Sequence, residues 1–343
     1  ARTDDVLFKN PKARTVIEWA LGEARITVLR DDTFKVTRTV TIPESHTALV
    51  IGPEAKLVAG PDPKLTVLTE GHGNYAALIH NQRRDNVSIV NLGTLDGGGE
   101  MVEKEGGARD YQFTSEGYEK SSANGIIFDG RNGGTCGIDG GLIFSVGQIK
   151  RCHELFWIVD SANVRIPLLW SESYGNCPIA MEGCEDCTLG FIAGLAGGKA
   201  AENETLDFNS FNERIKVGTV LGTGRVKDEI LDINNSPECT IDRVVGYGAP
   251  NEMTLVNSPV YGPGGRRLTQ KPYIDHSDGT VVHEKEAIDV NVVEWRKEVE
   301  LPDFPGSLPV LKVKATLTAV LDDGSEEEIF SKNYRLNLDK PRK

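Results

Sequence analysis

The sequence lacks a hydrophobic run long enough to cross a membrane. Its longest apolar stretches, Gly141 to Val146 and Leu155 to Val159, fall far short of the roughly 18 residues that a membrane-spanning helix needs. Basic residues are also in the minority, because 38 Lys and Arg face 51 Asp and Glu and leave a formal net charge of −13. Such a charge repels nucleic acids and anionic membrane surfaces, so neither is expected as a partner.

Several well-known catalytic motifs are absent too. The chain has no G-x-x-x-x-G-K-[ST] phosphate loop, no G-x-S-x-G and no H-E-x-x-H, which leaves nucleotide-binding, serine-hydrolase and zinc-protease functions without support. The one C-x-x-C, at Cys184 and Cys187, has no second pair beside it. We therefore expect small buried side chains there rather than a zinc or redox centre.

The first residues show no charged segment followed by an apolar one. Either the chain has no export signal or it is the processed form, and we expect a secreted or periplasmic protein whose signal has been removed.

Aromatic residues make up only 7% of the chain, whereas glycine is abundant, with 37 residues. This balance favours many short strands and tight turns over a helical bundle. The segment Asn10 to Gly22 has the apolar spacing of a short amphipathic helix, and from Arg25 onward apolar and polar residues alternate as they do in strands.

A repeat appears when segments with an apolar-x-apolar step are superposed. Val164, Cys187, Ile215 and Cys239 open such steps, and the intervals between them are 23, 28 and 24 residues. That spacing suits one coil of three short strands and three turns, stacked on the next coil. The sequence therefore predicts an all-β fold, a right-handed parallel β-helix over residues 24–262. An N-terminal cap helix would occupy residues 1–23, and a C-terminal loop and β-strand extension residues 263–343. That extension would cap the last coil or contribute to a homo-oligomer.

Two passages resemble the pectin-lyase-like superfamily of right-handed β-helices: RITVLRDDTFKVTRTVTIPESHTALVIGPEAKLV and NVSIVNLGTLDGGG. The resemblance spans about Val16 to Val260 and does not single out one family. It implies an enzyme that acts on a polymeric carbohydrate, such as a polysaccharide lyase, a glycoside hydrolase, an epimerase or a fructan-cleaving transferase. More rarely, such a protein is a phage tailspike.

An acidic stripe is predicted along one face of the coils. Asp207 lies between Leu206 and Phe208, and Asp232 lies between Leu231 and Ile233, so both carboxylates should point outward at the same place on neighbouring coils. Asp160 and Glu182 would lie one outward position further along, on the two preceding coils, and Glu204 and Glu229 at the starts of the same strands.

Three interpretations of this stripe stay open. It could be a screened acidic surface. It could bind Ca²⁺ or another divalent cation through Asp207, Asp232, Glu182 and Glu204, since hard cations prefer carboxylate oxygens. Alternatively, Asp207 and Asp232 could be the two carboxylates of a glycoside hydrolase or transglycosylase. No organic cofactor is expected.

Elimination from a uronic-acid polymer needs a base, an acid and a charge that neutralises the substrate carboxylate. Tyr174 and Lys216, together with Asp207 and Asp232, are the candidate catalytic residues. The candidate substrate-binding residues are His153, Lys150, Trp170 and Arg83. Each has a more ordinary alternative: solvated surface for Lys216, a structural role for His153, and core packing for Trp170.

We accordingly expect an extracellular polysaccharide-degrading enzyme. A lyase that cleaves an alginate-type or pectate-type polymer by β-elimination ranks slightly ahead of a hydrolase or transglycosylase that uses Asp207 and Asp232. A non-enzymatic glycan-binding adhesin or tailspike-like protein is the third possibility.

Overall fold

The computed structural model describes most of the chain. The described residues are 12–60, 65, 67–70, 73–103, 109–115, 118–131, 136–171, 177–195, 205–223, 230–247, 253–256, 285–288, 292–301 and 310–338. They contain one helix, α1 (Ala13–Glu23), and strands that form four sheets. In the part of the chain that the structure describes, no helix is long and apolar enough to cross a membrane.

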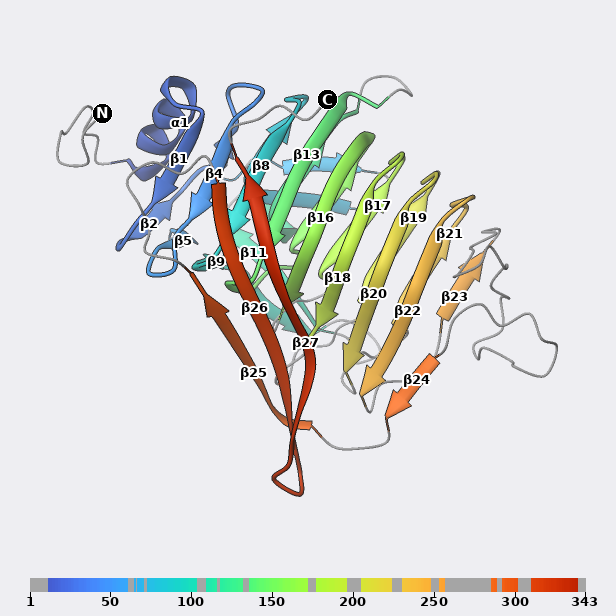
Figure 1. The fold of residues 1–343 in the computed structure, drawn as a ribbon. Coiled ribbons are helices and arrows are strands. Elements are labelled where there is room, and N and C mark those ends of the chain that lie inside the picture. The colour runs from blue at the N-terminus through green and yellow to red at the C-terminus, as the bar shows by residue number, and fades with distance from the viewer. Residues whose placement is uncertain are drawn as a thin grey trace.

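The largest all-parallel sheet has nine strands that lie side by side as a ladder (Figure 1). In spatial order they are β1 (Ile26–Leu29), β4 (Ala48–Ile51), β8 (Val87–Asn91), β13 (Ile138–Ser145), β16 (Ser161–Ser171), β18 (Thr188–Gly194), β20 (Lys216–Thr223), β22 (Thr240–Tyr247) and β24 (Lys285–Ile288).

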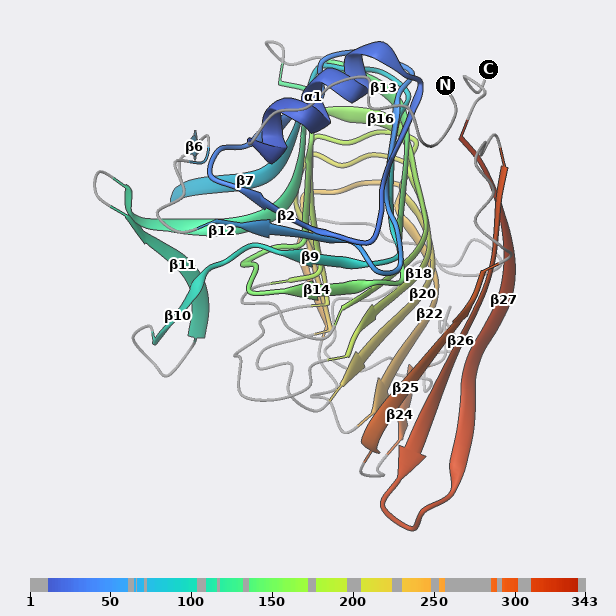
Figure 2. The same ribbon diagram turned by 90° about the vertical axis from the view of Figure 1, so that its left-hand side faces the viewer.

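A second sheet has eleven strands and is also parallel along most of its length. Its strands are β3 (Val40–Thr41), β6 (Val67–Glu70), β7 (Gly73–Gln82), β10 (Glu100–Glu103), β11 (Arg109–Ser115), β12 (Tyr118–Asp129), β15 (Phe156–Val159), β17 (Ile179–Glu182), β19 (Leu206–Ser210), β21 (Leu231–Asn234) and β23 (Met253–Val256). Antiparallel pairing occurs at β6 with β7 and at β10 and β11, which project away from the other sheets (Figure 2). A third, four-stranded parallel sheet consists of β2 (Thr33–Val36), β5 (Lys56–Ala59), β9 (Thr94–Asp96) and β14 (Gln148–Lys150).

Successive strands of the chain alternate between these sheets. From β15 to β22 the odd-numbered strands belong to the eleven-stranded sheet and the even-numbered strands to the nine-stranded one. Thr188 pairs with Lys216, and Lys216 pairs with Thr240, so each strand stacks on a strand one repeat earlier. This register confirms the repeat that the sequence predicts at the residues just before these, Cys187, Ile215 and Cys239.

The main hydrophobic core lies between the parallel sheets. Leu206 and Phe208 of β19 and Leu231 and Ile233 of β21 are fully buried in it. Cys184, Cys187 and Cys239 lie in the same core and are free thiols, as expected for small buried side chains. Helix α1 packs against β1, β2 and β3 and buries Ile17 and Leu21 in this core at its N-terminal end.

The turns that follow β15, β17, β19 and β21 share one backbone feature. Each of these four has two residues with positive φ, three positions apart. The pairs are Asp160 and Asn163, Gly183 and Asp186, Phe211 and Arg214, and Asn235 and Glu238. Because residues other than Gly, Asn and Asp seldom adopt this conformation, its recurrence indicates that the register between the parallel strands determines these turns.

The C-terminal strands form a separate antiparallel sheet of β25 (Val292–Glu300), β26 (Val310–Leu321) and β27 (Glu326–Asn337). A tight turn at Asp322 to Gly324 joins β26 to β27. The sheet lies beside β18, β20 and β22 (Figure 2). The ring of Phe330 lies 4.4 Å from that of Phe191 on β18, and the ring of Tyr334 lies 5.1 Å from that of Phe144 on β13. The described strands β25 to β27 of the extension therefore cover the outer face of the nine-stranded sheet, and a role in capping the last coil stays a prediction.

The structure confirms the all-β class with large parallel sheets. A right-handed β-helix is a finer description of the same strands and stays a prediction.

The docking of the C-terminal sheet can be tested with Leu317→Asp. Leu317 is fully buried against the nine-stranded sheet, so a charge there loses its hydration without gaining a partner, which typically costs several kcal/mol. We expect faster hydrogen exchange in β25 to β27, measured by mass spectrometry, with unchanged exchange in β15 to β19. Thr316→Asp, on the opposite face of the same strand, is the control and should change neither. Uniform loss of protection in the whole chain would contradict a separately docked layer.

Candidate functional site

The outer face of the eleven-stranded sheet brings two predicted carboxylates together. Asp207 of β19 pairs with Asp232 of β21, and on the other side Asp207 pairs with Ala180 of β17. Their strand neighbours Leu206, Phe208 and Ile233 point into the core, so the alternation of a strand directs both aspartates outward. Asp207 is nonetheless only 7% exposed.

The two carboxylates are not equivalent. Asp232 is half-buried, and its Oδ1 accepts a hydrogen bond of 2.8 Å from Nδ2 of Asn234. Burial raises the pKa of Asp232 above its ordinary value, and the Asn234 hydrogen bond opposes that rise only in part. In-register residues on parallel strands lie about 4.8 Å apart, so the two aspartates are close neighbours. Burial favours the protonated form of Asp232.

A second group of polar side chains lies on earlier strands of the same sheet; we call it the arginine cluster and define it as His80, Asp129 and Arg131. Arg131 binds Asp129 with both nitrogens of its fork, with Nε to Oδ1 at 2.7 Å and Nη2 to Oδ2 at 2.9 Å. His80 Nε2 lies 3.4 Å from Asp129 Oδ2, and the side chains of both residues are buried. The Arg131 guanidinium also lies over the ring of Trp157, 5.8 Å from its centre.

Two further carboxylates face the arginine cluster. Burial lowers the pKa of Arg131, while the charges of Glu182 and Asp160 act against that shift. Burial also raises the pKa of Asp160, and Arg131 opposes the rise. One cation thus serves Asp129, Asp160 and Glu182 on a partly desolvated surface.

The sheet register places His80 of the arginine cluster in one row of outward positions with the aspartate pair, while Asp129 lies in the next row, opposite Val159. Through successive strand pairs, the first of these rows runs through His80, Ile127, Trp157, Ala180, Asp207 and Asp232. Ile127, Trp157 and Ala180 belong to a small apolar cluster on this outer face. Along this face the arginine cluster and the carboxylate pair are therefore separated by an apolar cluster whose side chains are buried.

The structure brings only part of the predicted stripe together. Glu182 stands opposite Ser210 and faces Arg131, and Glu204 and Tyr174 lie outside the described residues. Among the described residues, no group of three or more His, Cys, Asp or Glu is arranged to hold a metal ion. The Ca²⁺ site stays a prediction, because one of its four proposed ligands is not described.

Two predicted site residues belong to the other large sheet, which corrects their proposed placement. Lys216 is exposed in β20. Since β20 belongs to the nine-stranded sheet, the Lys216 side chain does not face the aspartates on β19 and β21. Trp170 is in β16 and fully buried beneath the C-terminal sheet, where its Nε1 donates a hydrogen bond of 2.7 Å to the Val146 carbonyl. Its ring has no open face on which a sugar could stack.

The remaining predicted substrate-binding residues are not gathered beside the aspartate pair either. Lys150 is exposed at the end of β14 in the four-stranded sheet. His153 is buried, with Nε2 3.7 Å from Oε1 of Glu154, whose Oε2 accepts a hydrogen bond from Asn124. Arg83 is exposed in a turn, and its Nε donates a hydrogen bond of 2.8 Å to the Arg131 carbonyl. It therefore contacts the backbone of the arginine cluster.

Sequence reasoning missed Asp129 and Arg131. The available signal was the segment Ile126 to Arg131, IIFDGR, in which Asp129 follows an apolar strand as Glu182 follows Ile179 to Met181. The strand pairs align Asp129, Val159 and Glu182 in one row.

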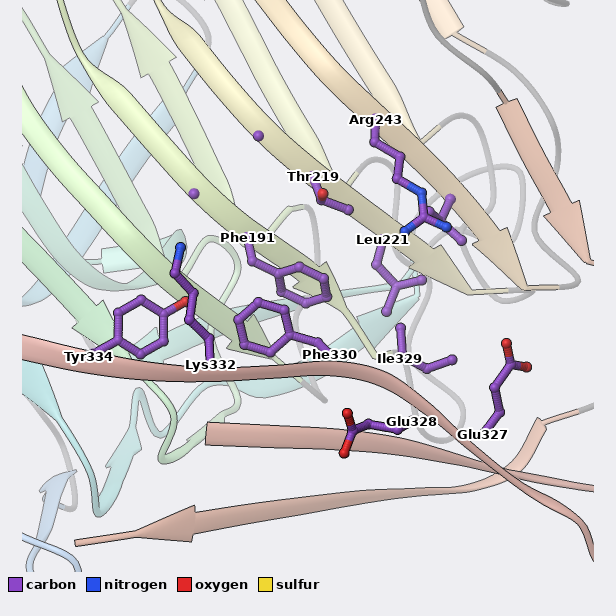
Figure 3. Close-up of a pocket in the computed structure, with 13 residues that line it drawn as sticks. Phe191, Thr219, Leu221, Arg243, Glu327, Glu328, Ile329, Phe330, Lys332 and Tyr334 are labelled. Carbon is purple, nitrogen blue, oxygen red and sulfur yellow. The ribbon is translucent and has the colours of Figure 1, made fainter. Parts of the chain in front are cut away.

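A cavity of about 410 Å³ lies on the opposite side of the molecule, between the nine-stranded sheet and β27 (Figure 3). The rings of Phe191 and Phe330 face each other at its wall, and Arg243, Glu327 and Glu328 lie toward its rim. Its lining comprises Gly190, Phe191, Gly218, Thr219, Leu221, Arg243, Val245, Glu327, Glu328, Ile329, Phe330, Lys332 and Tyr334. Its two acidic residues, Glu327 and Glu328, are adjacent on one strand and point apart in Figure 3. We therefore prefer the eleven-stranded sheet, where Asp207 pairs with Asp232, as the candidate site.

Comparisons with known proteins leave the family open. No family model matches the chain, and no curated protein matches it. Among solved structures, it is similar to a protein from Parabacteroides merdae described as "a putative glycosyl hydrolase", with 12% sequence identity and a TM-score of 0.36. The match covers 74% of this chain and 90% of that one. A similarity of this size does not establish the activity of this chain.

Removal of the Arg131 side chain should destabilise the protein. Arg131→Ala leaves the buried Asp129 carboxylate without its bidentate partner, and we expect a loss of about 3 kcal/mol in the free energy of unfolding, measured by denaturant titration. Arg131→Lys should lose less, since it keeps the charge but not the fork. The control, Arg296→Ala, removes an exposed arginine that contacts Glu294 and Glu326 and should cause no measurable loss. If Arg131→Ala were as stable as Arg296→Ala, the ion pair between Arg131 and Asp129 would not stabilise the fold.

The raised pKa of Asp232 predicts a pH dependence. The folded state holds the Asp232 proton to a higher pH than the unfolded state, whose pKa is about 3.9. The wild-type free energy of unfolding should therefore fall as the pH rises from about 4 through the raised pKa. Asp232→Asn lacks this fall and also removes a like charge opposite Asp207, so near pH 7 it should be more stable by roughly 0.2–1 kcal/mol. A pH profile parallel to that of the wild type would show that Asp232 has an ordinary pKa.

Proposed function

We propose that the protein is a carbohydrate-active enzyme that cleaves glycosidic bonds by hydrolysis or transglycosylation, with Asp207 and Asp232 as its two catalytic carboxylates. The observation that carries the proposal is the pairing of Asp207 with Asp232 on neighbouring parallel strands, both on the outer face of the sheet. Retaining glycosidases hold their two carboxyl groups about 5–5.5 Å apart. The spacing of parallel strands, about 4.8 Å, suits that separation.

The environments of the two aspartates suggest their roles. Asp232, whose pKa is raised by burial, would be the general acid that gives its proton to the glycosidic oxygen as the bond to the anomeric carbon breaks. The ionised Asp207 would attack the anomeric carbon and form a covalent ester. Water, or a sugar hydroxyl in transglycosylation, would then lose a proton to Asp232 and displace Asp207.

The shape of the face supports a polymer as substrate. We further propose that the alternating sheets are the faces of a right-handed parallel β-helix, because each strand stacks on a strand one repeat earlier. Such an arrangement repeats outward positions along one line. Arg131, whose side chain is 31% exposed, would then contact sugars on one side of the bond that is cleaved. Since polysaccharides are met mostly outside cells, the proposal includes a secreted or periplasmic location.

Elimination from a uronic-acid polymer is the alternative, and it has less support in the described residues. Lys216, one of its two candidate proton-transfer residues, lies on the other sheet, and the net charge of −13 opposes an anionic substrate unless a cation offsets it. Ca²⁺ bound near Asp207 and Asp232 would provide that offset, and it belongs to this alternative.

The test is incubation with xylan, barley β-glucan, inulin, alginate and pectate. We expect new reducing ends, or new oligosaccharides from inulin, without the ultraviolet absorbance of unsaturated uronates. Asp207→Asn and Asp232→Asn should each lower kcat by at least about 100-fold, and products of the wild type should retain their anomeric configuration in NMR spectra. Lys216→Ala is the control and should act at the wild-type rate. Unsaturated products would establish elimination instead, and binding without turnover would identify a non-enzymatic glycan-binding protein.

A further inference from the structure

Phe211 is a large apolar side chain in an unusual position. It lies in the turn between β19 and β20 and is 73% exposed. Its backbone has φ of +59°, a conformation that bulky side chains seldom adopt because their Cβ is crowded there. Phe211 thus combines an exposed aromatic ring with a strained backbone, and neither feature stabilises the fold.

The corresponding turns of other coils contain residues that tolerate this conformation. Asp160, Gly183 and Asn235 occupy the same place and also have positive φ. Gly and Asn adopt it at little cost, and Asp does so more readily than an aromatic residue. The corner geometry therefore does not call for phenylalanine, and a role outside folding is the better explanation.

The position of Phe211 places it at the rim of the candidate site. Residues at the same turn position contact the arginine cluster: Arg83 donates a hydrogen bond to the Arg131 carbonyl, and Asp160 interacts electrostatically with Arg131. Phe211 follows Asp207 by four residues along β19 and its turn, a span of about 13 Å at the rise of an extended chain. A sugar that lay on the Phe211 ring would therefore be further from the aspartate pair than the two sugars joined by the bond that is cleaved.

The surroundings of the ring suit a sugar. On the preceding coil its neighbour is Gly183, because Glu182 pairs with Ser210, and glycine has no side chain to cover the ring. On the following coil its backbone N–H donates a hydrogen bond of 3.0 Å to the Asn235 carbonyl. Half-buried Glu182 and Asn234 lie on the adjacent strands and offer groups that bind hydroxyls.

We propose that Phe211 is a stacking platform for a sugar ring of the bound glycan, at a subsite remote from the bond that is cleaved. The C–H face of a pyranose or furanose ring would lie on the aromatic face, while neighbouring polar side chains bind its hydroxyls. Phe211 is then a positioning residue rather than a catalytic one. This inference rests on the proposed carbohydrate-active function.

The experiment uses Phe211→Asn, which introduces the residue type found at the equivalent position, Asn235. It is made in the Asp207→Asn plus Asp232→Asn background, so that binding is measured without turnover. The probes are xylan, barley β-glucan, inulin and pectate in affinity electrophoresis. We expect the variant to bind the retained polysaccharide roughly threefold to tenfold more weakly than its parent, and to have a higher Tm because the strained turn is relieved.

Two controls separate stacking from general effects. Phe211→Trp keeps an aromatic face and should bind at least as tightly as the parent, without the gain in Tm. Val293→Asn changes the other large apolar side chain that is highly exposed among the described residues, at 64%, and should leave binding unchanged because it lies in the C-terminal sheet.

The proposal is overturned if Phe211→Asn binds as tightly as its parent, if its Tm falls, or if the parent retains none of the four polysaccharides. It is also overturned if sedimentation shows a wild-type oligomer that Phe211→Asn dissociates, since the ring would then cover an interface between copies. Hydrolysis that survives in the background variant, together with weaker binding by Phe211→Asn, would reject the aspartate pair and retain the platform.

Discussion

The hydrogen-bonded register between parallel strands is the constraint on which the other features depend. It stacks Cys187, Ile215 and Cys239 in the core, repeats the positive-φ corners, and sets Asp207 beside Asp232. A slip of one residue in β19 would turn Leu206 and Phe208 outward and Asp207 inward. The apolar core therefore fixes the geometry of the candidate site, although no core residue belongs to it.

Most of the parallel architecture could be predicted from the sequence, because apolar alternation and repeat spacing report directly on which side chains are buried. The aspartate pair could be predicted for the same reason, since Leu206 and Phe208 determine the direction of the residue between them.

The parts that could not be predicted depend on contacts between distant segments. Trp170 looked available for a sugar because nothing near it in the sequence shows that β26 and β27 cover β16. Arg131 looked unimportant because, besides its neighbour Asp129, the groups that it meets come from distant segments, with Trp157 on β15 and Glu182 on β17. Lys216 follows Asp207 closely in the sequence but lies in the other large sheet, and sequence spacing does not show which sheet face a polar residue shares with another.

The C-terminal sheet changes how the proposed stack of coils should behave. In a simple solenoid each coil contacts only its neighbours, and the ends can fray one coil at a time. Here the Tyr334 hydroxyl donates a hydrogen bond to the carbonyl of Pro167, a residue 167 positions earlier, and its ring packs on Phe144 of the preceding coil. Contacts of such high sequence separation couple the middle coils to the C-terminal strands and slow folding. During synthesis on the ribosome, the parallel strands would therefore lack these contacts until the C-terminal strands emerge.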